Sequence, residues 1–192
     1  MSILPIVTYD DPVLMKPGTP VHPEHPGLQD LIDDMFETMY HANGVGLAAP
    51  QVGHSLRMFV VDADVITEEE ENGEKHGPGV FINPEIEILE DDYWDAEEGC
   101  LSIPDVRENV TRPFRIHIRY YDRDFQWCEA EHEGWYARVL QHEYDHIKGV
   151  LFIDYLGSFR KRLIRGKLEE IRKGAVKTEY PLLSRKPATG QR

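Results

Sequence analysis

The sequence contains no long apolar run and very little cysteine. No stretch approaches the ~20 consecutive apolar residues that a membrane-spanning helix requires, and residues 1–7 lack the charged region and the small-residue cleavage site of a secretory signal. Two cysteines are too few for a disulfide framework. We therefore expect a cytoplasmic protein in which each cysteine packs, binds a metal or reacts.

Basic residues are also scarce over most of the chain. The formal charge is −14 over 192 residues, which disfavours nonspecific nucleic-acid binding by the chain as a whole. Residues 1–159 contain 10 Lys and Arg against 32 Asp and Glu, whereas residues 160–192 contain 11 against 3. The basic end is either a solvated helix face or a docking element for an anionic partner such as ribosomal RNA, and its sequence leaves both readings open.

The hydrophobic pattern predicts one globular domain of mixed helices and strands. Helical spacing predicts helices over residues 28–41, 135–148 and 158–173, the last with Ser158 as its N-cap. Short β-rich runs predict strands at residues 58–61, 80–82, 86–89 and 115–120, joined by turns and not by crossover helices. The acidic run 68–75 predicts an exposed loop. Residues 178–192 show no period, and we expect a loosely held basic tail there.

The predicted second helix carries a pattern typical of metal-dependent hydrolases. It reads His142-Glu143-Tyr144-Asp145-His146. Residues four apart share one face of a helix, so both imidazoles can bind one metal ion, while Glu143 lies alongside to move a proton from bound water.

A catalytic site of this kind needs a third protein ligand, and its identity decides the class of enzyme. A metzincin would place a third histidine where this chain has Phe152, which excludes that class. A thermolysin-like enzyme would use a later glutamate, but the candidates Glu169 and Glu170 lie in a strongly basic helix. Cys100 is the better candidate, because a glycine before it and Pro104 after it indicate a tight, exposed backbone, and a coordinating thiol loses its proton. Cys128 is interpreted as a small buried packing residue.

Three segments in this order and spacing resemble the bacterial-type peptide deformylase family. They are GVGLAAPQ at residues 44–51, EGCLS at 98–102 and QHEYDH at 141–146. The resemblance covers roughly residues 3–156. It implies an α+β fold with antiparallel β-sheets packed around a central metal-binding helix, and a single catalytic domain over residues 1–177 that includes the basic helix 158–173.

The resemblance also implies a set of catalytic roles. One divalent ion, Fe²⁺ in the native enzyme with Zn²⁺ or Ni²⁺ as alternatives, would be held by Cys100, His142 and His146. Glu143 would act as general base and acid. Gln51 and the backbone N–H of Leu101 would form an oxyanion hole, where each donor is typically worth ~3–4 kcal/mol.

The implied substrate is the N-formylmethionyl end of a nascent polypeptide, from which formate is released. Implied substrate contacts are Val45, Gly46, Gly99, Arg107 and Val139. The family pattern also pairs Glu98 with Arg112. Trp135 and Arg138 stand where many members carry smaller apolar residues, so the shape of the methionine pocket is not predicted. Two alternatives stay open, a zincin-like endopeptidase and a catalytically silent ribosome-docking protein with a structural metal.

Overall fold

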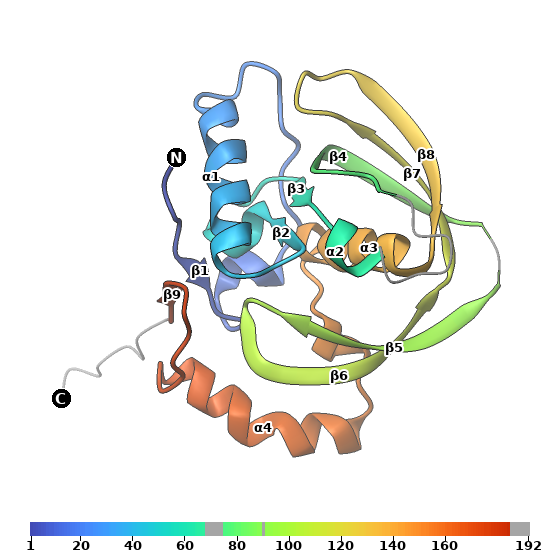
Figure 1. Ribbon diagram of the computed structural model, residues 1–192. Helices are drawn as coiled ribbons and strands as arrows, with labels where there is room; N and C mark the ends of the chain where they lie inside the picture. The colour runs from blue at the N-terminus through green and yellow to red at the C-terminus, as the bar shows by residue number, and fades with distance from the viewer. Residues whose placement is uncertain (68–74, 90, 185–192) are drawn as a thin grey trace.

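The computed structural model describes residues 1–67, 75–89 and 91–184, and its strands form three separate sheets (Figure 1). The largest is a five-stranded antiparallel sheet in the order β2-β3-β4-β7-β8. Its strands are β2 (Gly46–Ala48), β3 (Met58–Val61), β4 (Gly79–Ile88), β7 (Arg115–Tyr121) and β8 (Trp127–Glu133). An antiparallel pair joins β5 (Tyr93–Cys100) to β6 (Ile103–Pro113), and a parallel pair joins β1 (Ile6–Val7) to β9 (Leu182–Leu183).

Four α-helices and three short 3₁₀ helices complete the described structure. The α-helices are α1 (Leu28–His41), α2 (Asp64–Thr67), α3 (Gly134–Lys148) and α4 (Ser158–Arg172), and the 3₁₀ helices are η1 (Pro12–Met15), η2 (Ala49–Val52) and η3 (Phe152–Tyr155). The predictions for the three long helices are confirmed within one residue at each end. Ser158 is not the N-cap of α4, because Gly157 holds that position and no side chain caps the helix.

Helix α3 lies at the centre of the molecule, which confirms the predicted α+β architecture (Figure 1). Its buried Tyr136, Ala137 and Leu140 pack in one hydrophobic cluster with Phe59 of β3 and Ile118 of β7. Its other side faces the β5–β6 pair. The helix is therefore held between two sheets, so the side chains it directs toward β5 have a fixed position.

Glycine ends α3 for a steric reason. Gly149 adopts a left-handed conformation with φ of 78°, and its backbone N–H donates back to the last turn of the helix. A Cβ atom at this position would lie 2.7 Å from the backbone nitrogen of Lys16. Only glycine fits both constraints, and the chain can then turn toward η3.

The other two long helices cover separate parts of the core. Helix α1 buries the stripe predicted from its spacing, including Leu31, Ile32, Met35 and Met39, against the cluster that contains Met58 of β3. Helix α4 buries Ile164 and Ile171 against β6 and η3. None of the helices in the described ranges combines the length and the apolar character needed to cross a bilayer.

The strand predictions were partly confirmed. β3 and β7 appear where expected, but the runs 80–82 and 86–89 form one strand, β4, whose pairing is irregular between Ile82 and Glu85. Pro84 has no N–H to donate, and Asn83 adopts φ of 49°. The Asn83 side chain exchanges two 2.8 Å hydrogen bonds with the backbone of Val21, which holds the irregular point in place.

The C-terminal segment differs from the prediction. Residues 178–184 are not loosely held, because Leu182 and Leu183 pair with Ile6 and Val7 and the Ile6 N–H donates to the Pro181 carbonyl at 2.8 Å. Residues 185–192 and residues 68–74 of the acidic run lie outside the described residues. That residues 1–177 form a single catalytic domain stays a prediction.

Candidate metal centre

Three donor side chains from two elements converge on one point. Cys100 is the last residue of β5, and His142 and His146 lie one turn apart on α3. Their donor atoms all lie within 4.8 Å of one another, and Cys100 Sγ is 3.3 Å from His146 Nε2. A tetrahedral ion with bonds of about 2.0–2.3 Å separates its ligands by about 3.3–3.7 Å. This soft and borderline donor set therefore fits a single divalent transition metal.

Glu98 holds His142 in place from behind. His142 Nδ1 lies 3.0 Å from Glu98 Oε2, and an ionised carboxylate can only accept, so Nδ1 donates and Nε2 is left as the donor atom for an ion. Arg112 donates to both carboxylate oxygens of Glu98 at 2.6 and 2.9 Å, and Arg138 adds a 2.6 Å bond. Burial opposes ionisation of Glu98, but the hydrogen bonds from His142 and Arg112 outweigh it and hold the pKa of Glu98 well below its usual range. The family-based pairing of Glu98 with Arg112 is confirmed.

Glu143 is a buried carboxylate beside the cluster. Its side chain is 4% exposed, and its Oε2 atom has no hydrogen-bond partner among the described residues. Burial raises the pKa of Glu143 to about 7. A group with this pKa can both accept and release a proton near neutral pH, which is the property that a general base and acid requires.

The Gln51 amide reaches the cluster from η2. Gln51 is 1% exposed, and its Oε1 accepts a 2.8 Å hydrogen bond from the backbone N–H of Ala48. That bond fixes which way the amide faces, and the Nε2 group lies 3.5 Å from Cys100 Sγ and 3.4 Å from Ser102 Oγ. Leu101 follows directly in the turn between β5 and β6. Both candidate oxyanion donors thus lie beside the cysteine.

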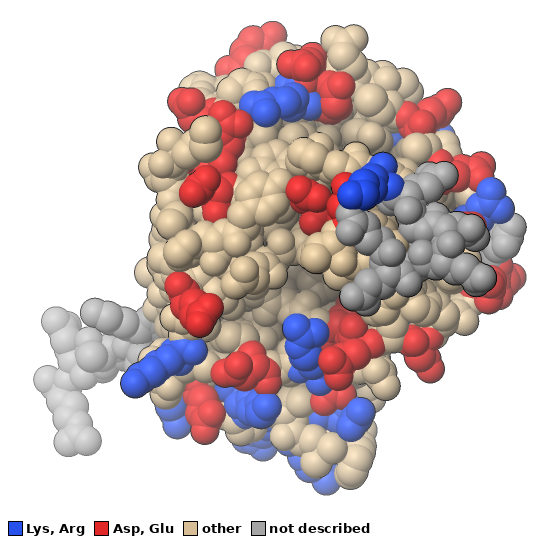
Figure 2. All heavy atoms as spheres, viewed as in Figure 1, with Lys and Arg blue, Asp and Glu red and all other residues tan. Residues whose placement is uncertain are grey.

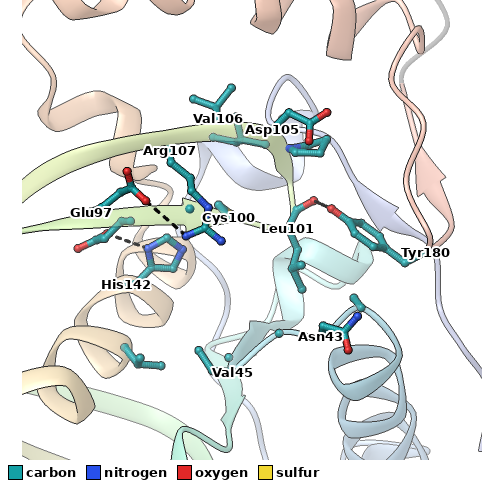
Figure 3. Close-up of a pocket in the computed structure, with 18 of the residues that line it drawn as sticks. Asn43, Val45, Glu97, Cys100, Leu101, Asp105, Val106, Arg107, His142 and Tyr180 are labelled. Atoms are coloured by element: carbon teal, nitrogen blue, oxygen red, sulfur yellow. Dashed lines mark hydrogen bonds and ion pairs between the residues drawn. The ribbon is translucent and has the colours of Figure 1, made fainter. Parts of the chain in front are cut away.

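A cleft of about 730 Å³ opens over this cluster (Figure 3). Its lining includes all five residues expected to contact substrate, namely Val45, Gly46, Gly99, Arg107 and Val139. The face shown in Figure 2 is hollowed between α2 and β5, where the cleft lies. Gln51 and His146 are not among the lining residues and support the site from behind. The volume is in the range of pockets that bind small ligands.

Arg138 and Trp135 line the cleft, but the charge of Arg138 is turned away from it. Arg138 is 2% exposed, donates to Glu98 and to the carbonyls of Val110 and Trp94, and lies 4.2 Å from the centroid of the Trp94 ring. This arginine was expected to shape the methionine pocket, whereas its guanidinium is bonded to Glu98. Its position on the ligand helix, one turn before His142, is the signal that the sequence offers.

The remaining candidates take ordinary structural places. Phe152 is buried and its ring centroid lies 6.1 Å from that of His142, so this position forms an apolar wall beside the ligand. Glu169 pairs with Arg172 at 2.7 Å, and neither Glu169 nor Glu170 lines the cleft. Cys128, expected to be buried, is half-buried on β8. Another group that sequence reasoning missed is the segment 177–180, which lines the cleft although it carries no periodic pattern.

Comparisons with known proteins point in one direction. The sequence pattern of the polypeptide deformylase family matches residues 3–162. The peptide deformylase of Salinibacter ruber is 52% identical over 190 residues, which is 97% of each chain. A crystal structure of a peptide deformylase from Legionella pneumophila is 40% identical with a TM-score of 0.78, covering 92% of this chain and 99% of its own. The Ehrlichia chaffeensis peptide deformylase in complex with actinonin is 38% identical with a TM-score of 0.81, covering 92% and 100%.

Proposed function

The chain belongs to the peptide deformylase family, and we propose that the residues around Cys100 carry out the reaction of that family. The protein is a metal-dependent hydrolase that removes the N-formyl group from nascent polypeptides. The observation that carries the assignment of roles is the convergence of one thiol and two imidazoles at a cleft, with the buried carboxylate of Glu143 beside them.

Cys100, His142 and His146 are the proposed ligands of one divalent ion. When bound, such an ion lowers the pKa of a coordinated water toward ~7 and so makes a nucleophile available at neutral pH. The native ion is proposed to be Fe²⁺, as the family likeness implies, although this donor set also accommodates Zn²⁺ and Ni²⁺. Glu98 supports the proposal, because its bond to Nδ1 keeps the His142 ring in the orientation that a ligand needs.

Glu143 is the proposed proton carrier. Its raised pKa suits it to accept a proton from the attacking water and then donate it to the amine that leaves as the C–N bond breaks. Gln51 Nε2 and the Leu101 N–H are the proposed donors to the oxyanion that forms on the formyl oxygen. The bond from the Ala48 N–H holds the Gln51 amide before substrate binds, so this donor can stabilise the developing charge without rearrangement.

The walls of the cleft are proposed to bind the formylmethionyl end. Figure 3 shows Val45 on one wall and Arg107 on the other, and Gly46 and Gly99 also line the cleft. Arg107 is largely exposed, and within the described part of the chain its one ion pair is with Glu97 at 3.8 Å, so its side chain is available to a peptide at the rim. Val139 lies on α3 next to the metal cluster and offers an apolar contact to the methionine side chain.

The catalytic proposal is tested by the variant Glu143→Ala, assayed for formate release from formyl-Met-Ala-Ser under anaerobic conditions with metal analysis of the same sample. We expect formate release to fall by at least about 10²-fold, while the metal content stays at the wild-type level. Glu170→Ala is the matched control, because Glu170 lies on α4 outside the cleft and should keep full activity. Formate release at the wild-type rate by Glu143→Ala would refute the role given to Glu143.

Helix α4 is also proposed to dock on the ribosome, with the protein acting in the cytoplasm where chains are made. Lys and Arg side chains gather over α4, along the lower edge of the face in Figure 2. Arg160 pairs with Glu108 at 3.0 Å, and Lys161 and Lys167 donate to backbone carbonyls. Arg162 and Arg165 are exposed and have no partner among the described residues, so they are the charges free to contact phosphate.

Charge reversal tests the docking proposal without removing the helix. The double variant Arg162→Glu and Arg165→Glu should weaken salt-sensitive binding to purified ribosomes and leave formate release from a tripeptide unchanged. Lys16→Glu, an exposed charge on another part of the surface, serves as the control. Equal ribosome binding by both variants and the wild type would refute the docking proposal and show that the basic side chains of α4 only face solvent.

A further inference from the structure

The C-terminal strap, residues 177–184, returns across the molecule to the mouth of the cleft. Its first four residues line the cleft, and Figure 3 shows Tyr180 across the cleft from His142. The strap leaves α4 through Gly174 and reaches β1, which belongs to the first ten residues of the chain. Nothing in the family motifs at residues 44–51, 98–102 and 141–146 accounts for a C-terminal segment at this place.

One side chain of the strap contacts the catalytic turn directly. The Tyr180 hydroxyl donates a 2.8 Å hydrogen bond to the backbone carbonyl of Leu101, and Figure 3 shows the ring reaching toward that residue. We propose that Tyr180 is a positioning residue for deformylation, because its bond holds the Leu101–Ser102 turn so that the Leu101 N–H stays aimed at the oxyanion. The inference rests on the oxyanion role proposed for that N–H.

The geometry of the turn explains why its carbonyl matters. The Leu101 carbonyl and the Leu101 N–H belong to two adjacent planar peptide groups that share one Cα atom, so rotation of one plane changes their mutual orientation. The turn lies between the last pair of β5 and β6, where the register shifts after Gly99. A bond to the carbonyl therefore opposes a peptide flip at the point where the sheet pairing is irregular.

Three further contacts hold the same turn from other sides, and one of them is the 3.0 Å hydrogen bond from the Tyr9 N–H to the Ser102 carbonyl. Gln51 Nε2 lies 3.4 Å from Ser102 Oγ. The Leu101 side chain packs so closely on Gly44 that a Cβ there would lie 2.9 Å from Leu101 Cδ1. Tyr180 supplies the restraint from the side of the cleft mouth. Together these contacts restrain the turn from several sides.

The strap is itself anchored well enough to do this. The Pro181 carbonyl accepts a 2.8 Å hydrogen bond from the Ile6 N–H. Strand β9 begins at the next residue and pairs with β1. Thr178 Oγ1 donates to the Tyr180 carbonyl at 2.6 Å, and the Tyr180 ring packs against the hydrophobic cluster that includes Leu101 and Leu182. The hydroxyl is thus delivered from a fixed backbone.

The test is Tyr180→Phe, which removes the hydroxyl and keeps the ring. Because the oxyanion exists only near the transition state, we expect kcat for formyl-Met-Ala-Ser to fall by about three- to tenfold, the range of one lost hydrogen bond, with KM unchanged. The melting temperature and the metal content should match the wild type. Tyr40→Phe is the matched control, since the Tyr40 hydroxyl also makes one hydrogen bond, at 2.7 Å to Asp62 Oδ2 on the surface, and Tyr40 does not line the cleft.

The outcomes separate this inference from the proposed function. A fall in kcat confined to Tyr180→Phe supports the positioning role. Three other outcomes would each overturn it: a wild-type kcat in Tyr180→Phe, a rise in KM with kcat unchanged, or equal losses of kcat in both variants. The strap would then only line the cleft or support the fold in general. A metal-loaded wild-type protein that releases no formate would refute the proposed function itself, whereas an active wild type with an equally active Tyr180→Phe refutes the positioning role alone.

Discussion

Replacing Glu98 by glutamine should damage both the stability of the fold and the affinity for metal. The Glu98 carboxylate is 6% exposed and accepts bonds from three side chains, two from Arg112 and one each from Arg138 and His142. A glutamine has one acceptor oxygen, and its NH₂ group would face cationic donors. Two buried guanidinium groups would lose the charge that compensates them.

The loss of stability in Glu98→Gln depends on which partners the buried arginines keep. Removing one partner of a buried ion pair typically costs about 3–5 kcal/mol. Asp145 still accepts a 2.8 Å bond from Arg112, so we expect the lower end of that range. In a chain of this length ~3 kcal/mol corresponds to a fall in melting temperature of roughly 6–12 °C. Loss of the bond that orients His142 should also weaken metal binding by about 10–100-fold.

The neighbouring carboxylate provides the control. Glu97 is largely exposed and lies 3.8 Å from Arg107, which is also exposed, so Glu97→Gln should change stability by less than about 0.5 kcal/mol. Thermal melts followed by circular dichroism and competition with a chelator of known affinity would measure the two effects. If Glu98→Gln melts within a degree of Glu97→Gln and binds metal equally well, the role given to Glu98 is wrong.

Three further predictions concern the glycine beside Glu143, the pH dependence of stability that Glu98 causes, and a glycine of α4. In Gly46→Ala the new Cβ would lie 2.5 Å from Glu143 Oε1, so the carboxylate must move, and kcat should fall by about 10–100-fold at unchanged metal content; wild-type kcat would show that the position of Glu143 is not critical. Because the pKa of Glu98 is depressed in the folded protein, its ionised form stabilises the fold at pH values above the ordinary Glu pKa of about 4.3. The free energy of unfolding in urea should therefore fall as the pH drops below that value, and its pH profile should be flatter in Glu98→Gln. Gly166→Ala, where nothing lies within 4 Å of the added Cβ, should raise stability by about 0.5–1 kcal/mol in the same unfolding assay, and a loss would mean that α4 is strained there.

The long helices and the two histidine ligands could be predicted from the sequence because each depends on local spacing. The stripe of α1 and the His142 to His146 separation are both consequences of 3.6 residues per turn. Cys100 was found because its neighbours indicate an exposed turn, and the family motifs supplied the roles of Gln51 and Leu101. Their positions in the structure agree with those roles, although the roles themselves are still proposals.

What sequence reasoning missed depends on contacts between distant segments. β6 alternates buried and exposed residues, but two of its inward positions are Glu108 and Arg112, which hide the apolar period. The covered face of β8 is only weakly apolar, because its half-buried residues are Cys128, Ala130 and His132. β9 is two residues long and is stable only through pairing with β1, at the opposite end of the chain. No local pattern encodes such a pairing.

The central claim is that one sulfur and two imidazole nitrogens bind a single ion. X-ray absorption at the zinc edge of the zinc-loaded protein tests this most directly. We predict a shell with one sulfur, from Cys100, at about 2.3 Å and two protein nitrogens, from His142 and His146, at about 2.0–2.1 Å. Substituting Cys100→Ser should remove the sulfur from that shell. A wild-type shell without sulfur, or a sulfur that persists in Cys100→Ser, would contradict the account.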